Sequence, residues 1–531
     1  MSFPYGIFPR CLCWAIDAAV GGSSVTSTTS SAVGPLEPKD DRPFFSRPET
    51  KQAIEDIANA KRLTIFVGAG ASSEVGLPNW HELMTRLLTR VGRSENLTGT
   101  ELEAFLTWAI ASEGLPAVGS IARAAFGNRF QRELRRSLYE SVREPLLPGA
   151  TARAVAEICS LWGDTCEVVT TNYDDLLESA LASAIPRSKV QSRTDEYDGV
   201  PGVVEVRHLH GIMTPSSTRG RLILSEADYY RGANPDAWQE TFFRKRFGDS
   251  TCLFIGSSMS DPNLLRYLYR HSRKRQVVIL LVRQADTWPG AESLESPIRL
   301  ARERVALLRW QEVRVTALHT DFYNQSAQFL WEVARRRKLG RSYESYGTRI
   351  DRWASYTADN ILRLDDQSAF AESQDRLQQQ ARAWLKTVVE IIERSTHLAS
   401  DERLAIHLWT RDPNARSLIM AVSSDRSWRD PKILRPQKIA LPSTWAAVNA
   451  FCRGVPCVWQ VDQVASKWGY IRAIPIHIEE KPLGRLPVGV VCIASTQPAN
   501  LSALARLKPA DMDAVSVYLT ENAADLLTPL A

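Results

Sequence analysis

The chain has 531 residues, too many for one hydrophobic core, so about two or three domains are expected. Hydrophobic residues make up 44% of it and charged residues 24%, which is ordinary for a soluble globular protein. The net charge of +5 is too small for this length to indicate a nucleic-acid partner, and the absence of any run of about 18 apolar residues argues against a membrane span.

The first segment, residues 1–45, is predicted to be a disordered arm, because residues 21–45 are rich in glycine, serine, threonine and proline. The eight cysteines are scattered and form no Cys-x-x-Cys pair. This spacing argues against a structural zinc ribbon and fits the reducing environment of the cytoplasm.

A strand and a glycine loop, Leu63–Val67 followed by Gly68-Ala69-Gly70, are the features around which the rest of the chain is organised. The apolar, β-prone run predicts a buried parallel strand. Small residues after it would let the phosphates of a nucleotide approach the backbone, and Ser72 could donate a hydrogen bond to them. An ordinary glycine turn is the alternative, because Gly-x-Gly alone is a weak signal.

Strands and helices then alternate to about residue 340, which predicts a doubly wound, parallel, Rossmann-like sheet over residues 46–340. A mostly helical insertion is expected at about 81–162. The strands are predicted at Leu63–Val67, Cys166–Thr170, Val203–Leu209, Thr251–Ile255, Gln276–Val282 and Glu312–Leu318, and the flanking helices at Pro48–Ala60, Leu176–Ala182, from Leu264, and at Ser326–Lys338.

Polar residues follow four of these strands at their carboxyl ends, where ligands bind in such sheets. The candidate ligand-binding residues are Gly68, Ala69, Gly70, Ser72, Thr171, Asp174, Gly256, Ser258 and Asp261. Asn172 and His210 are the candidate catalytic residues. We expect Asn172 to present an exposed amide that contributes little packing, and His210 to accept a proton, since histidine titrates near neutral pH.

Plainer interpretations remain for several of these residues. An asparagine after a strand is often a turn residue, and Asp261 before Pro262 could simply cap a helix. His208 and His210 would share a face of a strand, but no cysteine or carboxylate pattern completes a metal site, so we predict no metal. His208 is predicted to be structural.

The C-terminal part is predicted to hold a helical connector at 341–382 and an α+β domain at 383–531. Its elements are the helices Asp366–Arg394 and Pro509–Leu527 and the strands Leu404–Trp409, Ser417–Val422, Cys457–Val461, Tyr470–Ile478 and Val488–Ala494.

Residues 50–337 resemble the sirtuin-like NAD-binding domains, in particular their bacterial anti-phage branch. The matching motifs, in the family's order, are Gly68-Ala69-Gly70-Ala71-Ser72, Thr170-Thr171-Asn172-Tyr173-Asp174, His210-Gly211, and Phe254-Ile255-Gly256-Ser257-Ser258 with Asp261-Pro262-Asn263. The resemblance implies hydrolysis of NAD to nicotinamide and ADP-ribose, with depletion of NAD in infected cells. Two features depart from the protein deacylases of the family: the paired zinc cysteines are missing, and Asn79-Trp80-His81 stands where they carry Asp-Phe-Arg.

The C-terminal domain resembles the GAF domains, a family of small-molecule sensors. The resemblance depends on the order of elements and on the segments Gly454-Val455-Pro456, Ile471–Ile476 and Leu486–Val491. It implies either a bound small-molecule or protein activator or a dimerisation module; a dimerising domain without ligand is the alternative.

The sequence therefore predicts a cytoplasmic NAD hydrolase for which NAD is the substrate, controlled by its C-terminal domain and acting as a homo-oligomer. Two alternatives remain: an NAD-dependent protein deacylase, and a scaffold that binds NAD or ADP-ribose without turnover.

Overall fold

The computed structural model describes residues 42–140, 142, 146–195, 200–232, 237–271, 276–282, 305, 308–412, 416–441, 443–460, 466–481 and 483–529. The predicted arm thus lies almost wholly outside the described residues. Its last part does not: Phe44 and Phe45 are buried, and Phe45 packs on the ring of Tyr346 at a centroid distance of 4.4 Å.

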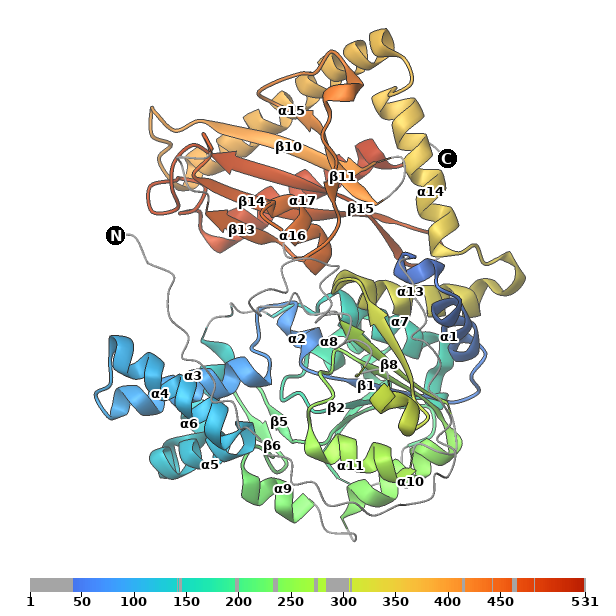
Figure 1. Cartoon of the computed structure of the whole chain (residues 1–531), viewed down its shortest axis with the longest axis vertical. Coiled ribbons are helices and arrows are strands. Elements are labelled where there is room, and N and C mark those ends of the chain that lie inside the picture. Colours follow the sequence, from blue (N-terminus) through green and yellow to red (C-terminus); the bar gives the residue numbers. More distant parts are fainter. Residues whose placement is uncertain are drawn as a thin grey trace, which may run out of the picture. The chain divides into compact units, whose positions relative to one another are not determined.

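The N-terminal half of the described chain is built on a seven-stranded sheet in which every neighbouring pair is parallel (Figure 1). In spatial order its strands are β3 (Val190–Arg193), β4 (Val204–His208), β2 (Cys166–Thr170), β1 (Leu63–Val67), β7 (Thr251–Ile255), β8 (Val277–Val282) and β9 (Thr316–Thr320). The chain order reverses beside β1, since the strands run outward through β2 on one side and through β7 on the other. The predicted doubly wound fold class is confirmed.

Helices cover both faces of this sheet. They are α1 (Pro48–Ala58), α2 (Gly70–Ser73), α7 (Ala150–Trp162), α8 (Leu176–Ala184), α10 (Trp238–Asp249), α11 (Pro262–His271) and α13 (Asn324–Leu339). The short helix α9 (Glu226–Gly232) contacts α11. Side chains alternate along a strand, so Leu63 and Ile65 of β1 enter the core with α1, α7, α8 and α13. Phe66 points to the other face, where it stacks on Phe254 at 4.2 Å in the core formed with α10 and α11.

A separate helical cluster holds α3 (Trp80–Ser94), α4 (Gly99–Glu113), α5 (Leu115–Phe126) and α6 (Phe130–Tyr139). Their core also contains Tyr173, Met213 and Leu224, which lie next to the strand ends. Met213 belongs to a hairpin of β5 (Ile212–Met213) and β6 (Thr218–Arg219), seen beside the cluster in Figure 1. Helix α7, which we expected within the insertion, packs in the core of the sheet instead.

One predicted strand is misplaced. Glu312–Leu318 was expected to be extended, but residues 308–312 are helical and β9 begins only at Thr316. The backbone turns at Arg314, whose φ of 58° is left-handed, and this turn puts Trp310 and Val315 into the same core.

The C-terminal domain is an antiparallel six-stranded sheet with helices on both faces. Its strands, in spatial order, are β12 (Gln437–Lys438), β11 (Ser417–Ser423), β10 (Leu404–Arg411), β15 (Arg485–Ser495), β14 (Tyr470–Glu479) and β13 (Cys457–Gln460). Helices α15 (Gln367–Ser395) and α17 (Pro509–Leu527) pack on one face, and α16 (Ala446–Arg453) packs on the other. The α+β architecture is as predicted, while the likeness to GAF domains stays a prediction.

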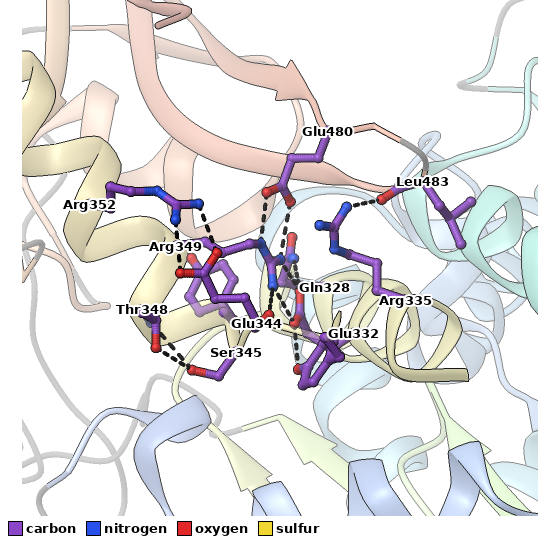
Figure 2. A network of polar contacts seen from close by, with 12 residues as sticks. Gln328, Glu332, Arg335, Glu344, Ser345, Thr348, Arg349, Arg352, Glu480 and Leu483 are labelled. Atoms are coloured by element: carbon purple, nitrogen blue, oxygen red, sulfur yellow. Dashed lines mark hydrogen bonds and ion pairs between the residues drawn. The ribbon is translucent and has the colours of Figure 1, made fainter. Parts of the chain in front are cut away.

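A buried ionic network joins the last helix of the parallel-sheet domain to the C-terminal domain (Figure 2). Arg349 of α14 (Tyr346–Tyr356) lies 2.6 Å from Glu332 of α13 and 2.7 Å from Glu480, which follows β14. Arg335 of α13 donates to the carbonyl of Leu483 in the same turn. Because Arg349 and Glu332 are both buried, each charge depends on the other for compensation.

Candidate active site

The candidate site lies at the carboxyl ends of β4, β2, β1 and β7, where the strand order reverses. A small pocket there is lined by residues that end these strands, including Gly68, Thr170, Thr171, Leu209 and Ser257. The register explains why they meet: Val67 pairs with Thr170 and with Ile255, and Thr170 pairs with His208.

Glycine is needed after β1 because the loop that follows this strand contacts the loop that follows β7. Gly68 donates to the carbonyl of Ile255 at 2.9 Å, and Gly70 donates to that of Gly256 at 2.8 Å. A Cβ on Gly68 would lie 2.6 Å from the Gly256 oxygen, and Gly256 itself has a φ of 64°. These glycines therefore pack strand-end loops against each other, and the amides of Gly68 and Gly70 are already used within the protein. Phosphate binding by Gly68, Ala69, Gly70 and Gly256 stays a prediction.

Asn172 is buried, contrary to our expectation of an exposed amide. Its Nδ2 donates to the carbonyl of Gly68 at 3.1 Å and to Oγ of Ser72 at 2.8 Å. Its side chain therefore links the end of β2 to the loop after β1. Oδ1 is buried and has no hydrogen-bond partner within the described part of the chain. A buried acceptor without a partner is rare and costs free energy. A ligand contact to Oδ1 stays a prediction.

Ser72 and Asp174 form the next part of the site. Ser72 Oγ donates to Asp174 Oδ2 at 2.7 Å, and the amide of Leu176 donates to Oδ1 at 3.2 Å. Burial raises the pKa of Asp174 in spite of these two hydrogen bonds. Asp174 therefore orients Ser72, and through it the amide of Asn172.

His208 has both ring nitrogens engaged, as expected of a structural histidine. Nδ1 lies 3.0 Å from the carbonyl of Asn172 and Nε2 lies 2.8 Å from Glu178. Burial lowers the pKa of His208, but the hydrogen bond and charge of Glu178 outweigh it, so the net pKa is raised. The stabilisation from this pair is therefore complete below the unfolded pKa of about 6.5 and is lost as the pH rises through the raised folded-state pKa.

His210 lies two residues beyond the last β4–β2 pair, at the strand end next to the one that Asn172 follows. It is buried, and its Nε2 is 3.3 Å from Oδ2 of Asp261. Burial lowers the pKa of His210, and the negative charges of Asp261 and Asp228 only partly oppose this. The imidazole is thus biased toward its neutral form, which can accept a proton.

Asp261 and Ser258 differ in their surroundings. Asp261 Oδ1 accepts from the amides of Asn263 and Leu264, so it caps α11 in the way that the plainer interpretation foresaw. Ser258 is exposed and its hydroxyl is 2.6 Å from that of Ser260, whereas the preceding Ser257 lines the pocket. Ligand binding by Thr171, Ser258 and Asp261 stays a prediction.

Sequence reasoning missed the contributions of α9. Tyr229 donates to Asp261 Oδ2 at 3.0 Å, and its ring meets that of His210 edge-on at 5.9 Å. Asp228 accepts from Arg123 at 2.7 Å and from the hydroxyl of Ser225 at 2.7 Å, which ties α5 of the helical cluster to the start of α9. Nothing in residue type or spacing links α9 to His210, so only the fold could reveal these contacts.

Within the described ranges, no group of three or more histidine, cysteine, aspartate or glutamate side chains is placed to hold a metal ion. The six described cysteines are free and buried. None of the described helices combines the length and the apolar character that crossing a membrane requires.

Comparison with known proteins identifies the class of this domain. Residues 166–305 match the model of the SIR2-like domain family. The chain is 21% identical over 302 residues to the NAD(+) hydrolase ThsA of Bacillus cereus (strain MSX-D12), a match that covers 55% of this chain and 56% of ThsA. Residues 166–305 thus match a SIR2-like domain, as the motifs indicated, while the region matched to ThsA spans little more than half the length of ThsA.

Solved structures of Sir2 homologues are also similar to this chain. One is a mutant Sir2 homologue with ADP-ribose, at 15% identity and a TM-score of 0.32, covering 55% of this chain and 98% of that chain. Another is a Sir2 homologue with NAD, at 14% identity and a TM-score of 0.30, covering 54% of this chain and 93% of that chain.

Proposed function

We propose that the SIR2-like domain is an NAD hydrolase that releases nicotinamide and ADP-ribose. Water adds to C1′ of the nicotinamide ribose, the bond from C1′ to the nicotinamide nitrogen breaks, and the proton of the water is lost. The observation that carries the proposal is the pair of Asn172 and His210 at adjacent strand ends, one with an unpartnered buried oxygen and the other buried beside a carboxylate.

Each of the two residues has a defined task in this proposal. Positive charge builds on the ribose as the bond breaks, and a buried acceptor can hold a ribose hydroxyl or the attacking water in place. Asn172 Oδ1 is that acceptor, since its amide nitrogen is held by Gly68 and Ser72. His210 accepts the proton, which its lowered pKa permits at neutral and mildly acidic pH.

Hydrolysis is favoured over protein deacylation by two features. The described cysteines lie buried and apart from any zinc-binding arrangement, whereas the deacylases carry a zinc module of two cysteine pairs. The similarity to an enzyme named NAD(+) hydrolase points the same way. A peptide carrying acetyl-lysine separates the two activities, because a hydrolase releases nicotinamide without it.

We place this activity in antiviral defence, by depletion of NAD in the cytoplasm of an infected cell. An NAD hydrolase that is always active would harm its own cell, so we assign control to the C-terminal domain, through a small-molecule or protein activator or through self-association. A ligand can shift the equilibrium between an inactive and an active state only if it binds these two states with different affinity.

Replacement of His210 tests its role directly. His210→Ala should lower kcat by roughly 10²-fold or more, because the proton acceptor is lost. In the wild type, the acid limb of kcat/KM should have its midpoint below about pH 6.5, since the pKa of His210 is lowered. Both are measured by nicotinamide release across pH.

His208→Gln is the matched control for that experiment. His208 is the last residue of β4, two residues before His210, and is also buried, but its nitrogens contact Asn172 and Glu178. We expect a lower melting temperature and a much smaller loss of kcat. The opposite ranking of the two variants would assign the proton transfer to His208.

A further inference from the structure

The surroundings of His210 define which of its two ring nitrogens can act as the base. A neutral imidazole carries its proton on one nitrogen and accepts with the other, and the groups beside the ring decide which. The charged and titratable groups around this ring are Asp261, at the start of α11, and Asp228 and Tyr229, on α9.

Asp261 contacts the ring at one nitrogen only. Its Oδ2 is 3.3 Å from Nε2 of His210, and an ionised carboxylate oxygen can only accept. A proton on Nε2 makes this contact attractive, whereas a bare Nε2 would turn its lone pair toward the carboxylate, so the contact favours the proton on Nε2. Nδ1 has no hydrogen-bond partner within the described part of the chain.

The carboxylate is itself fixed from three directions. Oδ1 accepts from two amides of the first turn of α11, at 2.9 and 3.0 Å, and Oδ2 accepts from the hydroxyl of Tyr229 at 3.0 Å. Tyr229 also packs its ring edge-on against His210 and lies near Trp80, with 6.0 Å between ring centroids. Asp261 and the imidazole can therefore shift little relative to each other.

We propose that Asp261 and Tyr229 are positioning residues that hold His210 as the Nε2–H tautomer, so that Nδ1 is the atom that takes the proton. The role of Nδ1 as the base depends on the proposed hydrolysis of NAD, whereas the assignment of the tautomer does not depend on it. The lower pKa of the neutral, buried ring then leaves Nδ1 available near pH 7.

The variants that test the inference are Asp261→Asn and Tyr229→Phe. Asparagine is as good a helix cap as aspartate, so Asp261→Asn keeps the start of α11 while removing the charge that selects the tautomer. Tyr229→Phe removes only the hydroxyl that holds Oδ2. Tyr139→Phe serves as control, because it removes a half-buried tyrosine hydroxyl that donates to the carbonyl of Met213 and not to Asp261.

The measurement is the ¹⁵N spectrum of histidine-labelled full-length protein at pH 7.5, together with kcat and KM for NAD. The wild type and Tyr139→Phe should show the His210 resonances of an Nε2–H tautomer, assigned by their loss in His210→Ala. Asp261→Asn should show mixed tautomers and a kcat lower by roughly 10-fold or more with little change in KM. Tyr229→Phe should show the same pattern to a smaller degree.

The assignment of the ring nitrogens and the proposed hydrolysis of NAD can be contradicted separately. An Nδ1–H tautomer in the wild type, or an unchanged tautomer in Asp261→Asn, would overturn the inference even if NAD is hydrolysed. A wild type with the Nε2–H tautomer but without NAD cleavage would contradict the proposed function and leave the assignment of the ring nitrogens standing.

Discussion

Asn172→Ala should reduce NAD cleavage by roughly 10²-fold or more, because it removes the buried oxygen that would hold the ribose or the attacking water. The same change removes the amide that donates to Gly68 and Ser72. Leaving these partners unsatisfied should also cost about 1–3 kcal/mol of stability. The loss of activity must therefore be separated from the loss of stability.

Asn449→Ala is a matched control for this purpose. Asn449 is buried in the C-terminal domain and donates its side-chain amide to the carbonyls of Ser443 and Trp445, at 2.8 and 2.9 Å. Truncation of Asn449 removes a similar pair of hydrogen bonds, but in the C-terminal domain and not at the candidate site. Both proteins should melt earlier than the wild type, but at a temperature where both are folded only Asn172→Ala should have lost turnover. Similar kcat values in the two variants would remove Asn172 from the catalytic machinery.

Arg349→Met should lower the free energy of unfolding by about 3–5 kcal/mol, because it leaves the buried carboxylate of Glu332 without its cationic partner. Glu480 would lose its contact as well, and with it one of the polar links between α14 and the C-terminal domain. The measurement is chemical denaturation of the full-length protein. Arg349→Met with Glu332→Gln should recover part of the loss, since no buried charge is then left alone.

Arg352→Met provides the comparison within the same helix (Figure 2). Arg352 also pairs with a glutamate, Glu344, at 2.8 Å, but its side chain is 68% exposed. Its removal should therefore cost about 1 kcal/mol or less. Equal losses for Arg349→Met and Arg352→Met would show that the buried network does not hold the two domains together.

The strands nearest the site were predictable because residue type alone indicates both that they are buried and where they end. Leu63–Val67, Cys166–Thr170 and Thr251–Ile255 are short runs of mainly β-prone residues followed by glycine, asparagine or serine, and all three have the bounds that were predicted. β3 was missed because its sequence, Val-Gln-Ser-Arg, is that of a half-buried edge strand with little apolar character.

Which residues gather at this edge of the sheet was predictable, but their contacts were not, and their role as a site stays a prediction. Gly68, Asn172 and His210 each follow a strand, and the carboxyl ends of parallel strands lie at one edge of the sheet, so we could predict that the three residues share this edge. Three features depend on pairings between distant segments, which residue type and spacing do not encode. They are the packing of Gly68 on Gly256, the burial of Asn172, and the contact of Tyr229 with Asp261.

The central claim is that this chain cleaves NAD with water as the acceptor. The direct test is to incubate the pure full-length protein, at high concentration and for hours, with NAD and without any acylated peptide, and to quantify nicotinamide and ADP-ribose. We expect the two products in equal amounts from the wild type, and both at an initial rate lower by roughly 10²-fold or more from Asn172→Ala. Nicotinamide that appears only when an acetyl-lysine peptide is added, or no cleavage of NAD in either condition, would contradict the account.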